Sequence, residues 1–587
     1  MTIRMAELIL SKIRPVRSVQ SVPLDTTLQN HPRRILSPFA QVPIQPLQEP
    51  LKLIAASEPA LNLLLTGEPE IPERIDLSER HPLVSVFAGN TIVHADIPPV
   101  AHRYWGTQFG NYADQLGDGA AMLIGEAGGY EINLKGSGIT PFSRGFDGRK
   151  VVRSSIREFL CSEAMAGLGI PTTRAGTVIL SENSKVMRDV NYSGQPIWEN
   201  CAVVARIAKT FIRFGSFESR DPADSQHIQQ LLKFTWERLL KPLRETESDS
   251  FMDVVIDRTA RTVALWSSVG FVHGVMNTDN MSIIGDTIDY GPFGFIESFD
   301  PHFVPNTSDK YGRYAFSEQP RVAEWNLKRL NETLVLHGNT SFCAADAEYI
   351  TSRFRLAYER MYYSRMRAKL GLSDSTDVDT EFEELLKDFW KAMDVSAVDF
   401  TYTFRCLCDL TPRNVPEIRE RIMTTFPSPE SQVRLSSVGL RVSRVDLPEI
   451  EEFARTRLAE LERFGIDLNT ICRWKHKLER IERLTRNEPD VRASAEASWD
   501  AVLTRLAGRI SDRSRSVMLS VNPAYVPRLS LMQEAIKLVE RDRDMSEVEK
   551  LLRLFQSPFI RDGTLTHPEL YEKPNLADYD AVLSCSS

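Results

Sequence analysis

Two oxygen-bearing side chains stand close together near the middle of the sequence. Met281 to Ile284 and Thr287 to Ile288 are short apolar pieces around the turn Gly285-Asp286. This pattern predicts a hairpin that delivers Asp289 beside Asn280. Amide and carboxylate oxygens suit Mg²⁺ carried by nucleotide phosphates, because this ion takes few protein ligands and completes its shell with phosphate and water. The alternative is a polar hairpin end in which both residues only form turns.

The order of polar residues along the chain is that of a protein kinase. It runs from a glycine loop (Gly117-Asp118-Gly119) through Lys135, Glu158, His273 and Asn280 to Asp289-Tyr290-Gly291. Kinases place their glycine loop, strand lysine, helix glutamate, catalytic loop and metal-binding Asp-x-Gly in this order. Asn280 also lies seven residues after His273, as in kinase catalytic loops.

One substitution argues against the ordinary kinase mechanism. Val275 stands two residues after His273, where a kinase has the aspartate that accepts the hydroxyl proton. A valine accepts no proton. Asp279, next to Asn280, is the nearby carboxylate that could accept a proton from an incoming hydroxyl.

Hydrophobic periodicity predicts the elements that position the earlier part of this series. Alternation over residues 130–135 predicts a half-buried strand that carries Lys135. A helix capped by Ser154 or Ser155 would carry Glu158 on the next element.

Later segments give weaker or mostly helical signals. Residues 177–180 and 185–188 flank a polar four-residue turn, which predicts a hairpin. Beyond Ala202 the pattern becomes mostly helical, with an apolar stripe over 350–361 and a last helical segment from about 531 to 555.

Composition bounds the class of protein. The chain has 587 residues, 42% hydrophobic and 26% charged, with a net charge of −8. These values exclude a disordered or membrane-spanning chain and give no reason to expect nucleic-acid binding. We expect four parts: an N-terminal segment 1–48, a strand-rich part 49–200, a part with the catalytic loop and metal site 201–470, and a helical extension 471–587.

The first 48 residues differ from the rest. They hold six basic residues against two acidic ones, and no acid occurs between Leu8 and Leu24. Ile3, Leu8, Ile9, Ile13 and Val16 could form an apolar helix stripe. The segment therefore indicates either a mitochondrial targeting peptide or a disordered tail, so the expected location is mitochondrial or otherwise cytoplasmic.

Three long stretches resemble the selenoprotein O (SelO) family of protein adenylyltransferases. They are YWGTQFGNYADQLGDG from Tyr104, INLKGSGITPFSRGFDGRKVVRSSIREFLCSEAMAGLGIPTTRA from Ile132, and HGVMNTDNMSIIGDTIDYGPFGFIESFDP from His273. The resemblance implies a two-lobed protein-kinase-like α/β fold with a largely helical C-terminal extension. It also implies that ATP binds in a reversed orientation, and that AMP moves to Ser, Thr or Tyr hydroxyls of proteins with release of pyrophosphate.

The same resemblance implies a role for each matching residue. Gly117 and Gly119 would line the nucleotide loop, and Asp147 and Gly148 would touch the nucleotide. The phosphates would be bound by Lys135, Arg206 and Arg213, with Glu158 orienting Lys135. Asn280 and Asp289 would hold Mg²⁺ or Mn²⁺, Asp289 would also contact the nucleotide, and Asp279 would be the base. If the stretch around Arg206 and Arg213 is helical, their seven-residue spacing puts both guanidinium groups on one side.

Two departures and two alternatives accompany this reading. Many members carry arginine where this chain has Ala120, so one phosphate or ribose contact is in doubt. Some members have selenocysteine near the C-terminus, where this chain has Cys585. A thiol there could serve redox regulation or substrate capture, or be inert. The expected partners are ATP and hydroxyl-bearing proteins, with redox proteins among the candidates. The alternatives are γ-phosphate transfer by a protein kinase and a nucleotide-binding pseudokinase scaffold.

Overall fold

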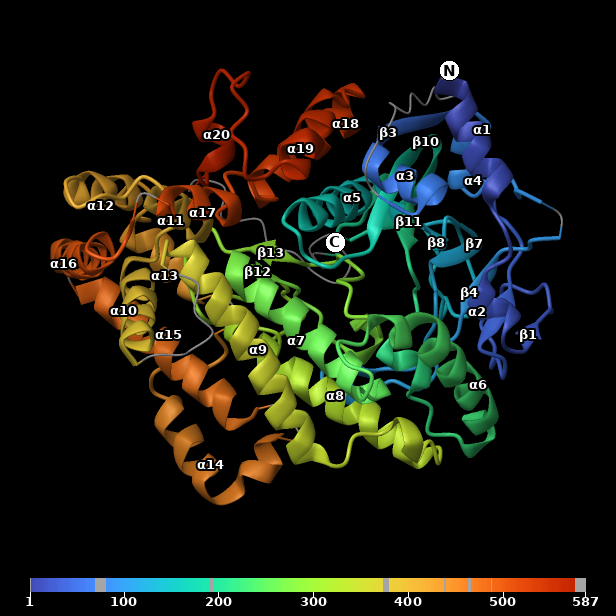
Figure 1. Cartoon of the computed structure of the whole chain (residues 1–587), viewed down its shortest axis with the longest axis horizontal. Coiled ribbons are helices and arrows are strands. Elements are labelled where there is room, and N and C mark those ends of the chain that lie inside the picture. Colours follow the sequence, from blue (N-terminus) through green and yellow to red (C-terminus); the bar gives the residue numbers. More distant parts are fainter. Residues whose placement is uncertain are drawn as a thin grey trace.

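The protein is a mixed α/β structure in which a sheet and a group of helices lie side by side (Figure 1). The computed structural model describes residues 2–68, 81–94, 96–189, 194–372, 380–437, 440–462, 466–486, 488–511 and 513–575. Cys585 lies outside the described residues. None of the helices in these ranges is long and apolar enough to span a bilayer.

The main sheet contains nine strands within the described ranges, in the order β1-β2-β4-β7-β8-β11-β10-β3, with β9 paired to β11. These strands are β1 (Leu24–Asp25), β2 (Phe39–Gln41), β3 (Leu51–Ala56), β4 (Val100–His102), β7 (Ala121–Ala127), β8 (Tyr130–Lys135), β9 (Lys150–Val151), β10 (Arg174–Arg188) and β11 (Ile197–Ala208). Two further pairs are β5 (Thr107–Gln108) with β6 (Asn111–Tyr112), and β12 (Phe271–Val272) with β13 (Gly294–Phe295). The pairing of β1 with β2 is parallel, and β8, β10 and β11 pair antiparallel.

Both faces of the central strands are covered. Val178 and Val204 pack into the core that contains α5 (Val152–Gly167). Their neighbours Ile179 and Val203 pack into a second core, formed with α1 (Thr2–Lys12), α3 (Glu58–Thr66) and α4 (Pro82–Phe87). The strand expected over 130–135 is confirmed as β8, but it is buried on both faces rather than half-buried.

Helix α5 starts earlier than expected and is covered from two sides. Its first residue is Val152, and the preceding Val151 is extended and makes no side-chain cap, so the predicted cap at Ser154 or Ser155 is wrong. One side of α5 packs against β10 and β11. The other contacts α18 (Leu529–Asp542) and α19 (Ser546–Gln556) (Figure 1). The segment expected to be one helix over 531–555 is thus two helices, and both belong to the α5 core.

The remaining helices form most of the other half of the molecule (Figure 1). They are α6 (Ser225–Thr235), α7 (Phe251–Val269), α8 (Gln319–Leu336), α9 (Ala347–Lys369), α10 (Thr380–Ser396), α11 (Phe400–Leu407), α12 (Val415–Met423), α13 (Pro429–Ser437), α14 (Leu447–Glu462), α15 (Leu468–Arg486), α16 (Glu488–Ala507), α17 (Ser514–Val521) and α20 (Glu569–Glu572), with α2 (Arg17–Gln20) beside the sheet. The stripe over 350–361 is confirmed within α9.

The hairpin predicted over residues 177–188 is wrong. Both halves belong to the single strand β10 and pair with β11, with a register shift between Leu180 and Lys185. The polar residues between them form a bulge whose carbonyls at Ser181 and Glu182 accept bonds from the Asn200 side chain, each at 2.9 Å. Strand β11 continues to Ala208, so the boundary expected between 200 and 201 falls inside this strand.

The N-terminal segment is part of the folded sheet half. Helix α1 packs against α3 and α4, and β1 and β2 extend the main sheet. Ile9, Ile13 and Val16 of the predicted apolar stripe face the core, where Ile9 and Ile13 are fully buried and Val16 is 4% exposed. Leu8 of the same stripe is exposed instead. The interpretation of residues 1–48 as a disordered tail is therefore wrong for residues 2–48.

Replacing Ile9 with alanine should lower the free energy of unfolding by about 2–4 kcal/mol, because a fully buried side chain leaves a cavity. Urea unfolding followed by circular dichroism measures the change. Leu8 is the matched control, since it is 42% exposed in the same helix and its replacement should stay within about 0.5 kcal/mol. Equal, negligible effects of both substitutions would contradict the packing of α1.

Candidate active site

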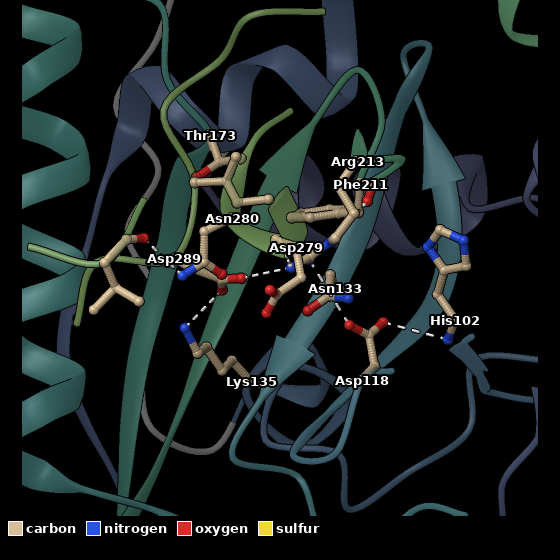
Figure 2. Close-up of polar contacts among 12 residues, drawn as sticks. His102, Asp118, Asn133, Lys135, Thr173, Phe211, Arg213, Asp279, Asn280 and Asp289 are labelled. Atoms are coloured by element: carbon tan, nitrogen blue, oxygen red, sulfur yellow. Dashed lines mark hydrogen bonds and ion pairs between the residues drawn. The ribbon is translucent and has the colours of Figure 1, made fainter. Parts of the chain in front are cut away.

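The Asp289 carboxylate is the centre of a cluster of three cations. Figure 2 shows two of them, Lys135 and Arg213. Oδ1 lies 2.8 Å from Lys135 Nζ and 2.5 Å from Arg206 Nη1, and Oδ2 lies 2.7 Å from Arg213 Nη1. Burial alone would raise the pKa of Asp289, but the three cations hold this pKa well below its usual range. Residues distant in the sequence therefore meet at one strongly charged point.

Strand register explains how Lys135 and Arg206 share this point. Val204 of β11 stands opposite Lys135 of β8, and Arg206 stands opposite Asn133. Residues two apart on a strand face the same side, so both cations project from one face of the sheet. The expectation that Arg206 and Arg213 lie on a helix is wrong, because Arg206 is in β11.

Arg213 reaches the cluster from an extended segment just before a short 3₁₀ turn, Phe214–Phe217. This segment pairs with the residues after Asn280, through a bridge between Arg213 and Ser282. Thr287 instead bridges to Thr172. The hairpin predicted over 281–288 is therefore wrong as a pairing, because each of its pieces pairs with a different distant segment. Asp289 nevertheless lies near the residue before Asn280, since Arg213 Nη1 binds both the Asp279 carbonyl and Asp289 Oδ2.

Glu158 contributes the second carboxylate of the cluster. It projects from α5, and its Oε2 lies 2.8 Å from Lys135 Nζ. Its Oε1 lies 3.5 Å from Arg206 Nη1. Lys135 is thus held between Glu158 and Asp289, which restricts the position of its ammonium group.

Asp279 presents an incompletely bonded carboxylate beside the cluster. Its backbone carbonyl accepts a bond of 2.7 Å from Arg213, and its Oδ2 accepts one of 3.0 Å from Gln108. Oδ1 is buried and has no hydrogen-bond partner among the described residues. Burial raises the pKa of Asp279 to about 6. The carboxylate is therefore mostly ionised near neutral pH, but it binds a proton more readily than an ordinary aspartate does. Both properties suit a general base.

The segment around β5 lies directly over Asp279. The Thr107 amide donates to Thr278 Oγ1 at 2.7 Å, and the hydroxyls of Thr107 and Thr278 both donate to the buried carboxylate of Glu218. At Gly106, a β-carbon would lie only 2.4 Å from Asp279 Oδ1. Sequence reasoning missed Gln108 and Glu218; Gln108 lies within the quoted stretch from Tyr104, whereas no local pattern singles out Glu218.

The loop Gly117-Asp118-Gly119 is closely packed beneath a neighbouring loop. A β-carbon at Gly117, whose φ is +133°, would lie 2.4 Å from Phe142 Cγ, and one at Gly119 would lie 2.8 Å from the Phe142 carbonyl oxygen. Between them, the buried Asp118 carboxylate faces Arg213 at 3.9 Å (Figure 2). The glycines permit this close approach, and Asp118 is a charged member of the site that sequence reasoning also missed.

Asp147 and Gly148 stand apart from the three-cation cluster. Asp147 pairs with Arg188 at 2.7 Å and accepts a bond of 3.0 Å from the Arg149 amide. A β-carbon at Gly148 would lie 2.2 Å from the backbone of Gly138, so this glycine allows two loops to touch. The structure thus brings Lys135, Glu158, Arg206, Arg213, Asp279, Asn280 and Asp289 together, and places the Asp147 loop separately.

The donor set fits a magnesium ion carried by a nucleotide. No group of three His, Cys, Asp or Glu side chains in the described ranges could hold a metal by itself. The Asn280 side-chain nitrogen donates to the Val275 carbonyl at 3.0 Å, which leaves Oδ1 as the oxygen for a metal. With Asp289, Asn280 offers the small oxygen set that Mg²⁺ completes with phosphate and water.

Three cations beside a carboxylate with one oxygen left without a partner are typical of enzymes that act on polyphosphates. The family described as "Protein adenylyltransferase SelO" matches residues 48–556. A relative from Mus musculus named mitochondrial protein adenylyltransferase SelO is 37% identical, with 94% of this chain and 88% of the relative covered. Its Homo sapiens counterpart is 40% identical, with 91% and 84% covered. The protein nucleotidyltransferase YdiU of Nitrosospira multiformis is 36% identical, with 97% and 96% covered. The chain belongs to the SelO family of protein adenylyltransferases.

Proposed function

We propose that this protein transfers AMP from ATP to Ser, Thr or Tyr hydroxyls of other proteins and releases pyrophosphate. The observation that carries the proposal is the convergence of Lys135, Arg206 and Arg213 on Asp289, beside the Asp279 carboxylate. We further propose that the sheet half and the helical half are the two lobes of a protein-kinase-like fold. The order of site residues along the chain supports this assignment.

The chemistry needs orientation and charge neutralisation more than covalent help. The hydroxyl oxygen attacks the α-phosphorus, the bond from that phosphorus to the bridging oxygen of the β-phosphate breaks, and pyrophosphate leaves. Asp279 Oδ1, which has no partner in the described part of the chain, takes the hydroxyl proton. Lys135, Arg206 and Arg213 neutralise the phosphate charge, and ATP in the reversed orientation presents its α-phosphate to the acceptor.

A divalent cation is part of the proposal. Asn280 Oδ1 and the Asp289 carboxylate would hold Mg²⁺ or Mn²⁺. The ion would polarise phosphate oxygens and offset the charge that develops as the bond to pyrophosphate breaks. Asp289 would then give up some of its bonds to the three cations and bind the metal instead. The cations released in this way would bind phosphate.

Protein partners and location are further proposals. Hydroxyl-bearing proteins, redox proteins among them, are the proposed substrates. The relatives from mouse, human and Danio rerio carry the word mitochondrial in their names. With the acid-free stretch between Leu8 and Leu24, this supports a mitochondrial location.

Labelled ATP tests the reaction class. With ATP labelled at the α-phosphate, the label should appear on the protein acceptor. With ATP labelled at the γ-phosphate, the label should leave with pyrophosphate and none should appear on protein. Asp279→Asn should lower the α-label incorporation by about 10²-fold or more, because the base is lost while the charge cluster stays.

The two alternatives give different results in the same assay. Transfer from the γ position only would identify a protein kinase and reject the proposal. Binding of ATP without transfer of either label would identify a pseudokinase scaffold, the reading that Val275 favours.

A further inference from the structure

Lys150 projects from the same face of the sheet as the cation cluster. It lies on β9 and pairs with Ala202 of β11, two residues before Val204, which faces Lys135. Alternate residues of β11 face one side, so the side chains of Lys150, Lys135 and Arg206 share that side. No motif in the sequence assigns Lys150 a role.

Gly136 lies between Lys150 and the end of the glycine loop. A β-carbon at Gly136 would lie 3.0 Å from Lys150 Cβ. The Gly136 amide in turn donates to the Ala120 carbonyl at 2.6 Å. One residue therefore separates Lys150 from Ala120, the residue that follows Gly119.

Lys150 is also close in the chain to the loop that holds Asp147 and Gly148, since it follows Gly148 by two residues. Charged groups of both parts of the site act on its ammonium group: Lys135, Glu158 and Asp289 of the cluster, and Arg188, the partner of Asp147.

Lys150 differs from the other cations of the site in its pairing. Lys135, Arg206 and Arg213 all bind Asp289. In the ranges that the structure describes, no carboxylate or other hydrogen-bonding group contacts Lys150 Nζ. Burial, followed by the charge of Lys135, lowers the pKa of Lys150 to about 8. An anion is the partner that this ammonium group lacks.

We propose that Lys150 binds a phosphate group of the nucleotide. This inference rests on the proposed function, because it requires a nucleotide at the cation cluster. Lysine acts on phosphate as a point charge and needs no bidentate geometry, so a single ammonium group on β9 can make this contact.

Titration calorimetry with ATP and with adenosine tests the proposal on the full chain. Lys150→Met should weaken ATP binding by about 10-fold or more and leave adenosine binding unchanged, because only the phosphate contact is lost. Lys150→Arg should restore ATP affinity to within about 3-fold. Lys209 is the control, since it is an exposed lysine that directly follows β11 and whose ammonium lies 3.9 Å from the centre of the Tyr130 ring. Lys209→Met should not change ATP affinity.

The outcomes separate this inference from the proposed function. If the wild type binds ATP and Lys150→Met binds it equally well, the inference is wrong and the proposed function stands. Equal losses for ATP and adenosine that Lys150→Arg does not restore would also overturn it, because they indicate a structural role. A wild type that does not bind ATP would reject both.

Discussion

Replacing Asp289 with asparagine should lower AMP transfer by about 10³-fold or more. The substitution keeps the shape of the side chain but removes the negative charge that Lys135, Arg206 and Arg213 share. It also removes one of the two proposed metal ligands. Binding of ATP should survive, because the three cations remain and phosphate oxygens can take the place of the lost carboxylate.

Label transfer from α-labelled ATP and calorimetric ATP binding measure the two effects separately. Asp257→Asn is the matched control, since Asp257 is also a carboxylate bonded to an arginine, at 2.6 Å from Arg353, but lies on α7 outside the site. That control should keep wild-type transfer. Transfer by Asp289→Asn within 10-fold of wild type would contradict the central role of this carboxylate.

Gly106→Ala should lower kcat by about 10²-fold and leave ATP affinity unchanged. The new β-carbon would lie 2.4 Å from Asp279 Oδ1 and 2.8 Å from its Cγ, closer than carbon and oxygen atoms can approach. The carboxylate must then turn away from the position at which it accepts the hydroxyl proton. Such small displacements of a catalytic group cost large factors in rate.

Steady-state kinetics with a protein acceptor checks this expectation, and circular dichroism shows whether the fold is retained. At Gly563 the space that a β-carbon would enter is open, so Gly563→Ala is the control and should keep wild-type kcat. A normal kcat for Gly106→Ala would mean that Asp279 moves freely and that its observed position is not the reactive one.

Much of the site follows from the order of residues in the chain. Alternation over 130–135 predicts the strand that ends at Lys135, and helical spacing predicts the helix that carries Glu158; both elements are present. The hydrophobic period determines these local elements, because each must bury one or both of its faces. Cys585 and its suggested redox role lie outside the described residues.

Pairing between distant segments could not be predicted in the same way. The polar residues 181–184 have the composition of a turn, yet β11 pairs with both flanking segments and holds them in one strand. Arg206 and Arg213 suit a helix by spacing, but the register of β11 with β8 places Arg206 on a strand. Long-range hydrogen bonding overrides local preference in these cases.

The three site residues that could not be predicted from the sequence share one property. Gln108, Asp118 and Glu218 each act through partners more than fifty positions away, at Asp279, Arg213 and Thr278. Short motifs cannot reveal such contacts. Their chemistry becomes visible only when the contacts are seen in three dimensions.

Helices α18 and α19 cover α5 and so support a helix that carries a residue of the site. Glu158 belongs to α5, which is confined between the sheet and these two helices. An outward movement of α5 that separates Glu158 from Lys135 would first have to detach α18 and α19 from α5. A movement of α5 away from the sheet would therefore require the release of α18 and α19. A fragment that stops before Leu529 would contain every residue of the site but would lack the support that keeps Glu158 in position.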